Sequence, residues 1–179
     1  MRAFRNFITL IVTLGLAACA REQAPPAAYP PPYGTARPPS PGGAVSAADF
    51  VAINGSIDLF VIRSSELALQ RSSSSRIREF ASRLIEDHKG TSGQLSFAGR
   101  RLNLLPSATL RSAEQAMLES LQSSSQFDAE YVRDQRTVHA RAIAIDGAYA
   151  ARGTSPTLRP VAAAALPIEQ RHLRMIAYL

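Results

Sequence analysis

The feature that most constrains the fold is an abrupt change in sequence pattern at Ser46. Most of the chain's 12 prolines lie before it, within residues 20–45. After it, apolar residues recur every three to four positions, which is the period of an amphipathic helix. No segment shows the alternation that is typical of a β-strand. The second part of the chain is therefore predicted to be all-α.

The helical pattern divides into four long segments and one short one. The predicted helices span residues 47–71, 75–101, 107–122, 126–152 and 157 to the end, the last with interruptions at Pro160 and Pro167. Ser46 and Asp49 resemble a capping box, and Gly153 is a natural stop for the fourth helix. Long amphipathic helices with short polar turns favour an antiparallel four-helix bundle over residues 46–179. The short helix would lie between the second and third long ones.

The start of the chain has the features of an export signal. Arg2 and Arg5 precede an apolar run at residues 7–16. Such a run, about ten residues long, suits a signal peptide and is too short for a membrane-spanning helix. Residues 16–19 (LAAC) resemble the bacterial lipobox, which implies cleavage before Cys19 and acylation of that residue. The sequence thus predicts a lipoprotein signal peptide at residues 1–18; an ordinary secretory peptide and an uncleaved anchor are the alternatives.

Cys19 is the only cysteine in the chain. The folded part is therefore expected to be held together by packing rather than by disulfides. Residues 19–45 are predicted to begin with the acylated Cys19 and to continue as a disordered, proline-rich tether. Ala20, which is not aspartate, favours an outer-membrane lipoprotein that faces the periplasm.

The chain carries a formal charge of +6, and among its 20 basic residues Lys89 is the sole lysine. A basic surface would suit anionic envelope components such as lipopolysaccharide. A GC-rich genome produces the same arginine bias, and an ordinary solvated helical surface is the favoured explanation. The sequence contains no nucleic-acid-binding motif.

All three histidines, His88, His139 and His172, fall on or beside apolar stripes, one on each of three helices. An ionisable group in such a position costs stability unless it has a partner. One explanation is a metal site that also uses Glu66, Asp87 and Glu169. The spacing of Glu169 and His172 matches the Glu-x-x-His motif of ferritin-like di-metal proteins, whereas the helix of His139 has no such motif.

The other explanation is structural, and the sequence favours it. In that case the histidines hydrogen-bond to core partners such as Gln135, Glu66 or Tyr131, and burial lowers the pKa of all three rings. The predicted heights of the residues along the bundle also argue against Glu66 and His88 as ligands of the same metal ion. Counted from their shared turn, Glu66 and His88 differ in height by roughly 9 Å.

Three segments resemble a known family: residues 64–95, 127–143 (FDAEYVRDQRTVHARAI) and 166–176 (LPIEQRHLRMI). They are similar to the bacterial domain of unknown function number 4142, and the similarity covers residues 48–179. The resemblance implies an exported protein with a ferritin-like fold. It also marks Glu66, Asp87, His88, His139 and His172 as positions of interest. It brings no activity.

Taken together, the sequence predicts a lipid-anchored cell-envelope protein. The first hypothesis is a non-enzymatic structural or binding module, related to stress, that requires no cofactor. The alternative is a transition-metal-binding or redox protein that uses His88, His139, His172 and Glu66.

The lipobox makes a direct prediction about Cys19. Replacing Cys19 with alanine should release the protein from membranes or leave an unprocessed precursor, because no thiol remains to carry the lipid. Metabolic labelling with a fatty-acid analogue and the mobility of the protein on a gel measure this. Unchanged labelling in the Cys19→Ala variant would contradict the lipoprotein hypothesis.

Overall fold

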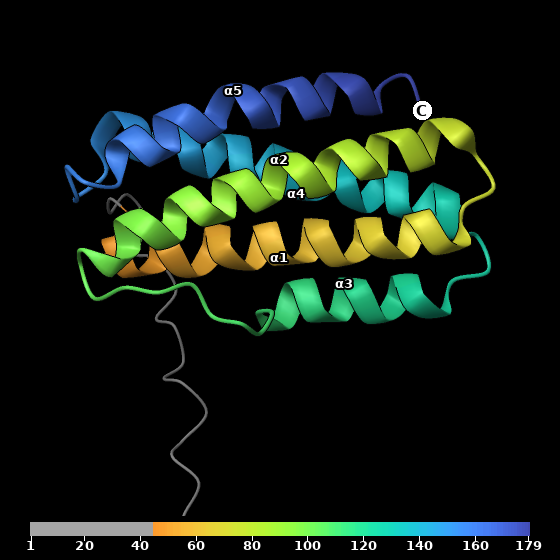
Figure 1. Cartoon of the computed structure of the whole chain (residues 1–179), viewed down its shortest axis with the longest axis horizontal. Helices are drawn as coiled ribbons and strands as arrows, with labels where there is room; N and C mark the ends of the chain where they lie inside the picture. The colour runs from red at the N-terminus through yellow and green to blue at the C-terminus, as the bar shows by residue number, and fades with distance from the viewer. Residues whose placement is uncertain (1–44) are drawn as a thin grey trace, which may run out of the picture. The chain divides into compact units, whose positions relative to one another are not determined.

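A computed structural model describes residues 45–179, which form five helices and no strand (Figure 1). The helices are α1 (Ala47–Arg71), α2 (Ser75–Arg100), α3 (Ser112–Ser123), α4 (Phe127–Arg152) and α5 (Arg159–Ile176). The all-α prediction is confirmed. The predicted bounds of α1, α2 and α4 agree with the structure to within a residue.

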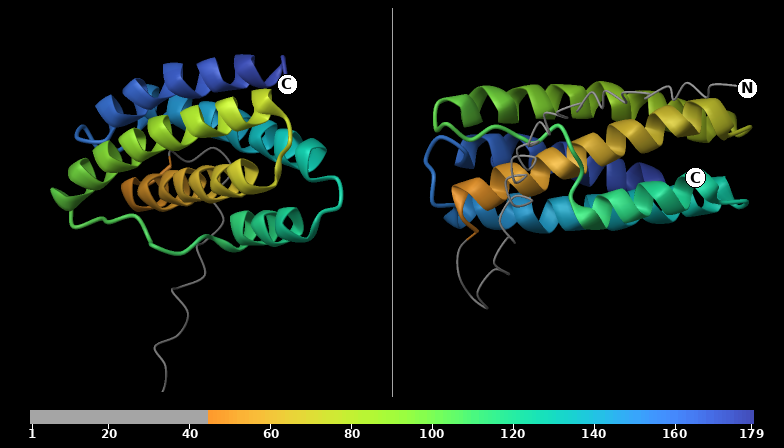
Figure 2. Two further views of the ribbon diagram at one scale, coloured as in Figure 1. Left: turned by 45° about the vertical axis from the view of Figure 1, so that its right-hand side comes forward. Right: turned by 90° about the horizontal axis from the view of Figure 1, so that it is seen from below.

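Four long helices, α1, α2, α4 and α5, pack into an antiparallel bundle (Figures 1 and 2). The helices α2 and α4 run in the same direction, so residues 101–126 must return along the length of the bundle between them. The short helix α3 forms part of this return and packs against α1 and α4. One long crossover of this kind is typical of the ferritin-like arrangement, as predicted.

The start of α1 shows how local sequence fixes a helix end. The Asp49 N–H donates to Ser46 Oγ at 3.0 Å, and the Ser46 hydroxyl donates to the Asp49 carboxylate at 2.7 Å. These two bonds satisfy groups that the first helical turn leaves without intrahelical partners. The predicted cap at Ser46 is confirmed.

The short helix begins at Ser112, so the prediction of a start at residue 107 is wrong. Side chains take the backbone N–H groups that a helix would use here: the Thr109 N–H donates to Ser107 Oγ at 3.1 Å, and the Arg111 N–H donates to Ser56 Oγ at 2.9 Å. Serine competes with helix formation in this way. Once α3 begins, buried Glu114 accepts a hydrogen bond from Ser56 and forms an ion pair with Arg141, which ties α3 to α1 and α4.

The last helix is continuous, so the predicted interruptions at Pro160 and Pro167 are also wrong. Pro160 lies in the first turn, where its missing N–H would have had no intrahelical acceptor. Pro167 lies inside the helix and removes one hydrogen bond. The helix continues past it because Ala162, Glu169, His172 and Ile176 are all buried against the rest of the bundle.

Two apolar clusters fill the bundle. The larger one includes Phe60, Phe80, Leu84, Leu121 and Tyr131, and the smaller one centres on Phe50, Leu95, Tyr149 and Leu158. Along α2 and α5 the buried residues between the two clusters are polar, and they include His88, Glu169 and His172. A polar layer therefore separates the two halves of the core.

The chain turns back sharply where α2 ends. The Leu104 N–H donates to the Gly99 carbonyl at 2.9 Å, and Asn103 has a positive φ of 54°. A Cβ at position 99 would lie 2.0 Å from the Leu104 carbonyl oxygen. Only glycine fits at this position.

This contact predicts opposite effects for two glycines of α2. Gly99→Ala should destabilise the protein by several kcal/mol, on the order of an overpacked core, because backbone must move. Gly90→Ala should stabilise it by about 0.5–1 kcal/mol, since a Cβ at position 90 meets no atom within 4 Å and alanine favours a helix. Urea unfolding followed by circular dichroism measures both. Equal effects for the two variants would contradict the close approach at Gly99.

Candidate metal centre

The polar layer is built from four helices at one level of the bundle. Asp58 precedes the last residue of α1, Arg71, by 13 positions, and His88 follows the first residue of α2, Ser75, by 13. The same holds for the hairpin of α4 and α5. His139 precedes the last residue of α4, Arg152, by 13 positions, and His172 follows the first residue of α5, Arg159, by 13. Each hairpin thus brings its two residues to the same height.

One nitrogen of each imidazole ring is bonded to an oxygen that lies away from the other rings. The three bonds are His88 Nδ1–H to Asp58 Oδ1 (2.8 Å), His139 Nδ1–H to the Gln135 carbonyl (2.7 Å) and His172 Nε2–H to Asp87 Oδ2 (2.9 Å). A carbonyl or carboxylate oxygen only accepts, so each of these nitrogens carries the hydrogen. The other nitrogen of each neutral ring therefore has a lone pair.

These second nitrogens face one another. His139 Nε2 lies 3.2 Å from His172 Nδ1. His88 Nε2 is buried without a hydrogen-bond partner and lies 3.9 Å from Glu169 Oε1. Glu169 Oε2 is also buried without a partner and lies 3.7 Å from His139 Nε2. One ligand atom from each of these four residues lies within 4.8 Å of the other three.

The electrostatics keep two of the rings neutral. Burial lowers the pKa of His172 to about 4, and burial together with nearby His88 holds the pKa of His139 well below its ordinary value. Two neutral rings at 3.2 Å present lone pairs to each other, which is repulsive unless a proton or a cation lies between them. The inner nitrogens of His139 and His172 are therefore two acceptors that face each other, and a proton or a cation between them would be stabilised.

His88 behaves differently, and the expectation of a lowered pKa for all three rings is wrong for it. Burial does oppose the charged form of His88, but the carboxylates of Glu169 and Asp58 outweigh burial and raise the pKa. Burial in turn raises the pKa of Glu169 to about 7. The pKa of Glu169 therefore lies close to neutral pH.

The dimensions suit a transition-metal ion. Two imidazole nitrogens bound at about 2.0–2.1 Å in a tetrahedral site lie roughly 3.3 Å apart. The separation of 3.2 Å between His139 Nε2 and His172 Nδ1 is close to that value. The ring centroids of the three histidines are 5.2–5.4 Å apart, so the three rings surround one point.

The structure brings together five of the six candidate site residues named from the sequence. Asp87 is half-buried beside this group, where it orients His172 and pairs with Arg171 at 3.0 Å. Glu66 is exposed and lines a different surface pocket, so it does not join the group. Of the structural partners expected for the histidines, the Gln135 carbonyl is used, whereas Tyr131 pairs with Ser65.

Asp58 is the residue that the sequence reasoning missed. Asp58, rather than Glu66, is the carboxylate of α1 that lies at the level of His88. Glu66 lies two helical turns closer to the connection between α1 and α2. The signal was present in the sequence: an aspartate in the apolar stretch IDLFVI, at matching distance from the turn.

Comparison with known proteins places this bundle in a family. Residues 34–179 match the family described as Domain of unknown function (DUF4142). The chain belongs to the DUF4142 family. A search of the curated proteins found no match.

Solved structures of CopM have the same fold as this DUF4142 bundle. The form described as "CopM in the Cu(II)-bound form" is 14% identical with a TM-score of 0.64, covering 76% of this chain and 96% of CopM. The Cu(I)-bound form is 13% identical with a TM-score of 0.63, covering 74% and 94%. The Ag-bound form is 14% identical with a TM-score of 0.61, covering 74% and 93%. At this identity the similarity shows the fold alone.

Asp146 is a further buried carboxyl group near the centre. It accepts a hydrogen bond from Asn54 at 3.1 Å, and burial together with the nearby carboxylates of Glu169 and Asp58 raises its pKa to about 8. The folded state thus binds a proton there that the unfolded state releases above about pH 4. Asp146 favours folding at low pH, and that contribution is lost as the pH rises toward about 8.

This predicts a pH-dependent effect of Asp146→Asn in metal-free protein. The variant keeps a group that can bond Asn54 and cannot ionise. Its free energy of unfolding relative to the parent should rise between about pH 4 and pH 8, by a few kcal/mol at most. Urea unfolding at a series of pH values measures it, with exposed Glu66→Gln as the control. A difference that does not vary with pH would contradict the shifted pKa of Asp146.

Proposed function

We propose that the bundle binds one transition-metal ion through His88, His139, His172 and Glu169. The observation that carries this proposal is the direction of the imidazole lone pairs. Each ring has its outer nitrogen fixed by an acceptor, and its inner nitrogen points toward one shared position beside a carboxylate. Metal-binding histidines in proteins are oriented in this way, by acceptors behind the ring.

The donor set favours a divalent ion. Three imidazoles and a carboxylate suit copper, zinc, iron or nickel, whereas thiolates and thioethers would select Cu(I). Among divalent ions of the first transition series, Cu(II) binds most tightly to a given set of nitrogen and oxygen ligands. The fold shared with CopM, whose structures carry copper or silver, supports copper as the first ion to test.

The structural explanation that the sequence favoured is supported less well. If the histidines served only to hold helices in register, both nitrogens of each ring should have partners, since buried polar atoms without them are costly. His88 Nε2 and Glu169 Oε2 have none, and the remaining inner nitrogens meet only each other and Glu169. An ion would satisfy all four groups at once.

The proposal includes the cell envelope as the location. It rests on the lipobox at Cys19 and on the proline-rich tether, which would let a bundle held at a membrane reach several tens of ångströms from it. Within residues 45–179 no helix is both long enough and apolar enough to cross a membrane. A lipid on Cys19 would supply the attachment.

Metal titration tests the proposal directly. The chain from Ala20 onward, stripped with a chelator, should bind one equivalent of Cu(II), and its melting temperature should rise with metal concentration by mass action. His139→Ala removes a ligand and should abolish this rise. Asp87→Asn keeps all four ligands but weakens the orientation of His172, so it should lower affinity by about 10–100-fold. Calorimetry and thermal unfolding give the stoichiometry, the affinity and the stabilisation.

Exposed Glu66→Gln is the matched control, because it changes a carboxylate of α1 outside the group. Its affinity for Cu(II) should equal that of the parent. If parent and His139→Ala bind copper equally, or if no stoichiometric metal binds, the metal proposal fails and the structural module remains.

A further inference from the structure

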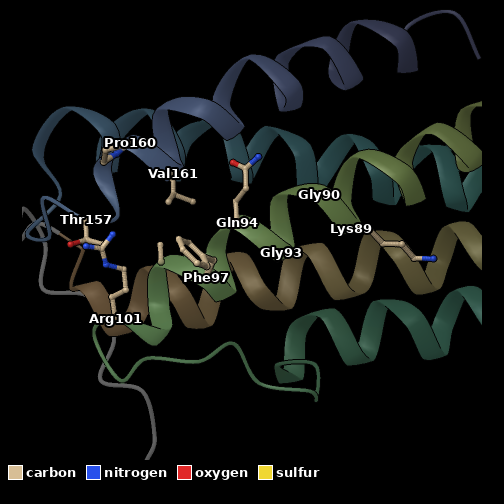
Figure 3. Close-up of a pocket in the computed structure, with 10 residues that line it drawn as sticks. Lys89, Gly90, Gly93, Gln94, Phe97, Arg101, Thr157, Pro160 and Val161 are labelled. Carbon is tan, nitrogen blue, oxygen red and sulfur yellow. The ribbon is translucent and has the colours of Figure 1, made fainter.

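A groove on the surface of the bundle has no role in the proposed metal site. It lies between the second half of α2 and the start of α5 and has a volume of about 640 Å³ (Figure 3). Sites for small molecules in proteins fall in the range of about 300–1,000 Å³. The walls are mostly apolar: Phe97 and Ala98 from α2 face Pro160 and Val161 from α5.

Two glycines on the α2 wall have no packing explanation. A Cβ at Gly90 or Gly93 would meet no atom within 4 Å. A glycine inside a helix destabilises it by about 0.5–1 kcal/mol relative to alanine. At Gly99 a close approach of the backbone explains this cost, but at Gly90 and Gly93 nothing does. What the two residues provide is a flat helix face that leaves the groove open.

Exposed apolar surface and unpaired positive charge meet in this groove. Phe97 is 68% exposed, and in Figure 3 Val161 points toward it from the opposite helix. Arg101 and Thr157 line one end of the groove, and Lys89 lies at the other end. Within residues 45–179 neither cation forms a salt bridge, and no carboxylate lines the groove. The distance along α2 from Lys89 to Arg101 is about 18 Å at 1.5 Å per residue.

We propose that this groove binds a long-chain fatty acid. The carboxylate lies at Arg101, whose planar guanidinium matches a carboxylate with two parallel hydrogen bonds, and the Thr157 hydroxyl adds a further donor. The acyl chain runs from there between Phe97 and Val161 and along the flat face of Gly93 and Gly90. Its length covers the apolar surface that the fold leaves exposed, which supplies the main part of the affinity.

Charge selects this ligand over a cationic amphiphile. The groove offers cations at both ends and no anion, so a positive head group would be repelled at either end. The site uses none of the four proposed metal ligands. Its occupancy can therefore be tested apart from metal binding, on metal-free protein.

A competition experiment tests the proposal with the chain from Ala20 onward. The fluorescent probe is 11-(dansylamino)undecanoic acid, which should bind one per chain with a rise in emission as the dansyl group leaves water. Dodecanoate, used below its micelle concentration, should displace the probe. Dodecyltrimethylammonium, with the same chain and the opposite charge, should displace it at least tenfold less well.

Three variants, two of them with matched controls, locate the site. Gly93→Leu fills the groove while favouring the helix, so it should fold and lose probe binding; Gly147→Leu, at an equally open helical glycine of α4, should retain it. Arg101→Gln should weaken dodecanoate by about tenfold, and neighbouring Arg100→Gln should not. Phe97→Ala, at an exposed position, should weaken the probe without loss of helicity.

The opposite results overturn the proposal. Equal binding by parent and Gly93→Leu would mean that the probe binds elsewhere. Equal displacement by dodecanoate and dodecyltrimethylammonium would mean that no carboxylate is recognised. A parent that is dimeric in solution, with Gly93→Leu monomeric, would show that a second copy of the chain covers the groove instead.

Discussion

The rest of the structure depends on a layer of imidazole lone pairs enclosed between two apolar clusters. His88, His139 and His172 are fully buried, and each is held from behind by an oxygen acceptor. Apolar packing alone cannot satisfy the inner nitrogens, because a lone pair removed from water needs a donor or a cation. The bundle therefore holds at its centre an unfavourable interaction that a hydrogen-bond donor or a cation would relieve. Its stability and its proposed function are linked through that position.

The backbone topology sets up this layer before any side chain is considered. Each hairpin places residues at equal distances from its turn at the same height, which is why Asp58 meets His88. The crossover through α3 then brings α4 alongside α1. Glu114 of α3 bonds to Ser56 of α1 and to Arg141 of α4, which holds the three helices in register. A shift of one helical turn, about 5.4 Å, would separate the ligand atoms beyond the reach of one ion. Polar contacts outside the layer thus protect its geometry.

The sequence predicted the bundle well because helical periodicity reports directly on which residues are buried. The same periodicity placed the three histidines on or beside buried stripes, whereas Glu169 was named from its Glu-x-x-His spacing with His172. Prediction from the sequence failed where the outcome depended on contacts between distant segments: the start of α3 depends on Ser56, 55 positions before Arg111, and α5 continues past Pro167 because its face is buried. Glu66 was chosen over Asp58 because both lie near apolar stripes of α1, and the hydrophobic pattern does not say which of them lies at the height of His88. The direction of each ring could not be read from the sequence, because it depends on which nitrogen finds an acceptor.

The charges around the layer give a further reason for a divalent ion. Three carboxylates lie in or beside the layer, those of Glu169, Asp58 and Asp87, and the Arg171 guanidinium pairs with the last. With neutral imidazoles, a divalent ion leaves this group without net charge, whereas a monovalent ion leaves one uncompensated negative charge in a buried site, which is costly. Without an ion, protons would have to provide the balance, and the raised pKa values of His88 and Glu169 agree with this. Binding of the proposed metal ion would therefore displace protons from the layer, which would couple its affinity to pH. In the proposed metal site a proton and a metal ion would compete for the same lone pairs of His88, His139 and His172.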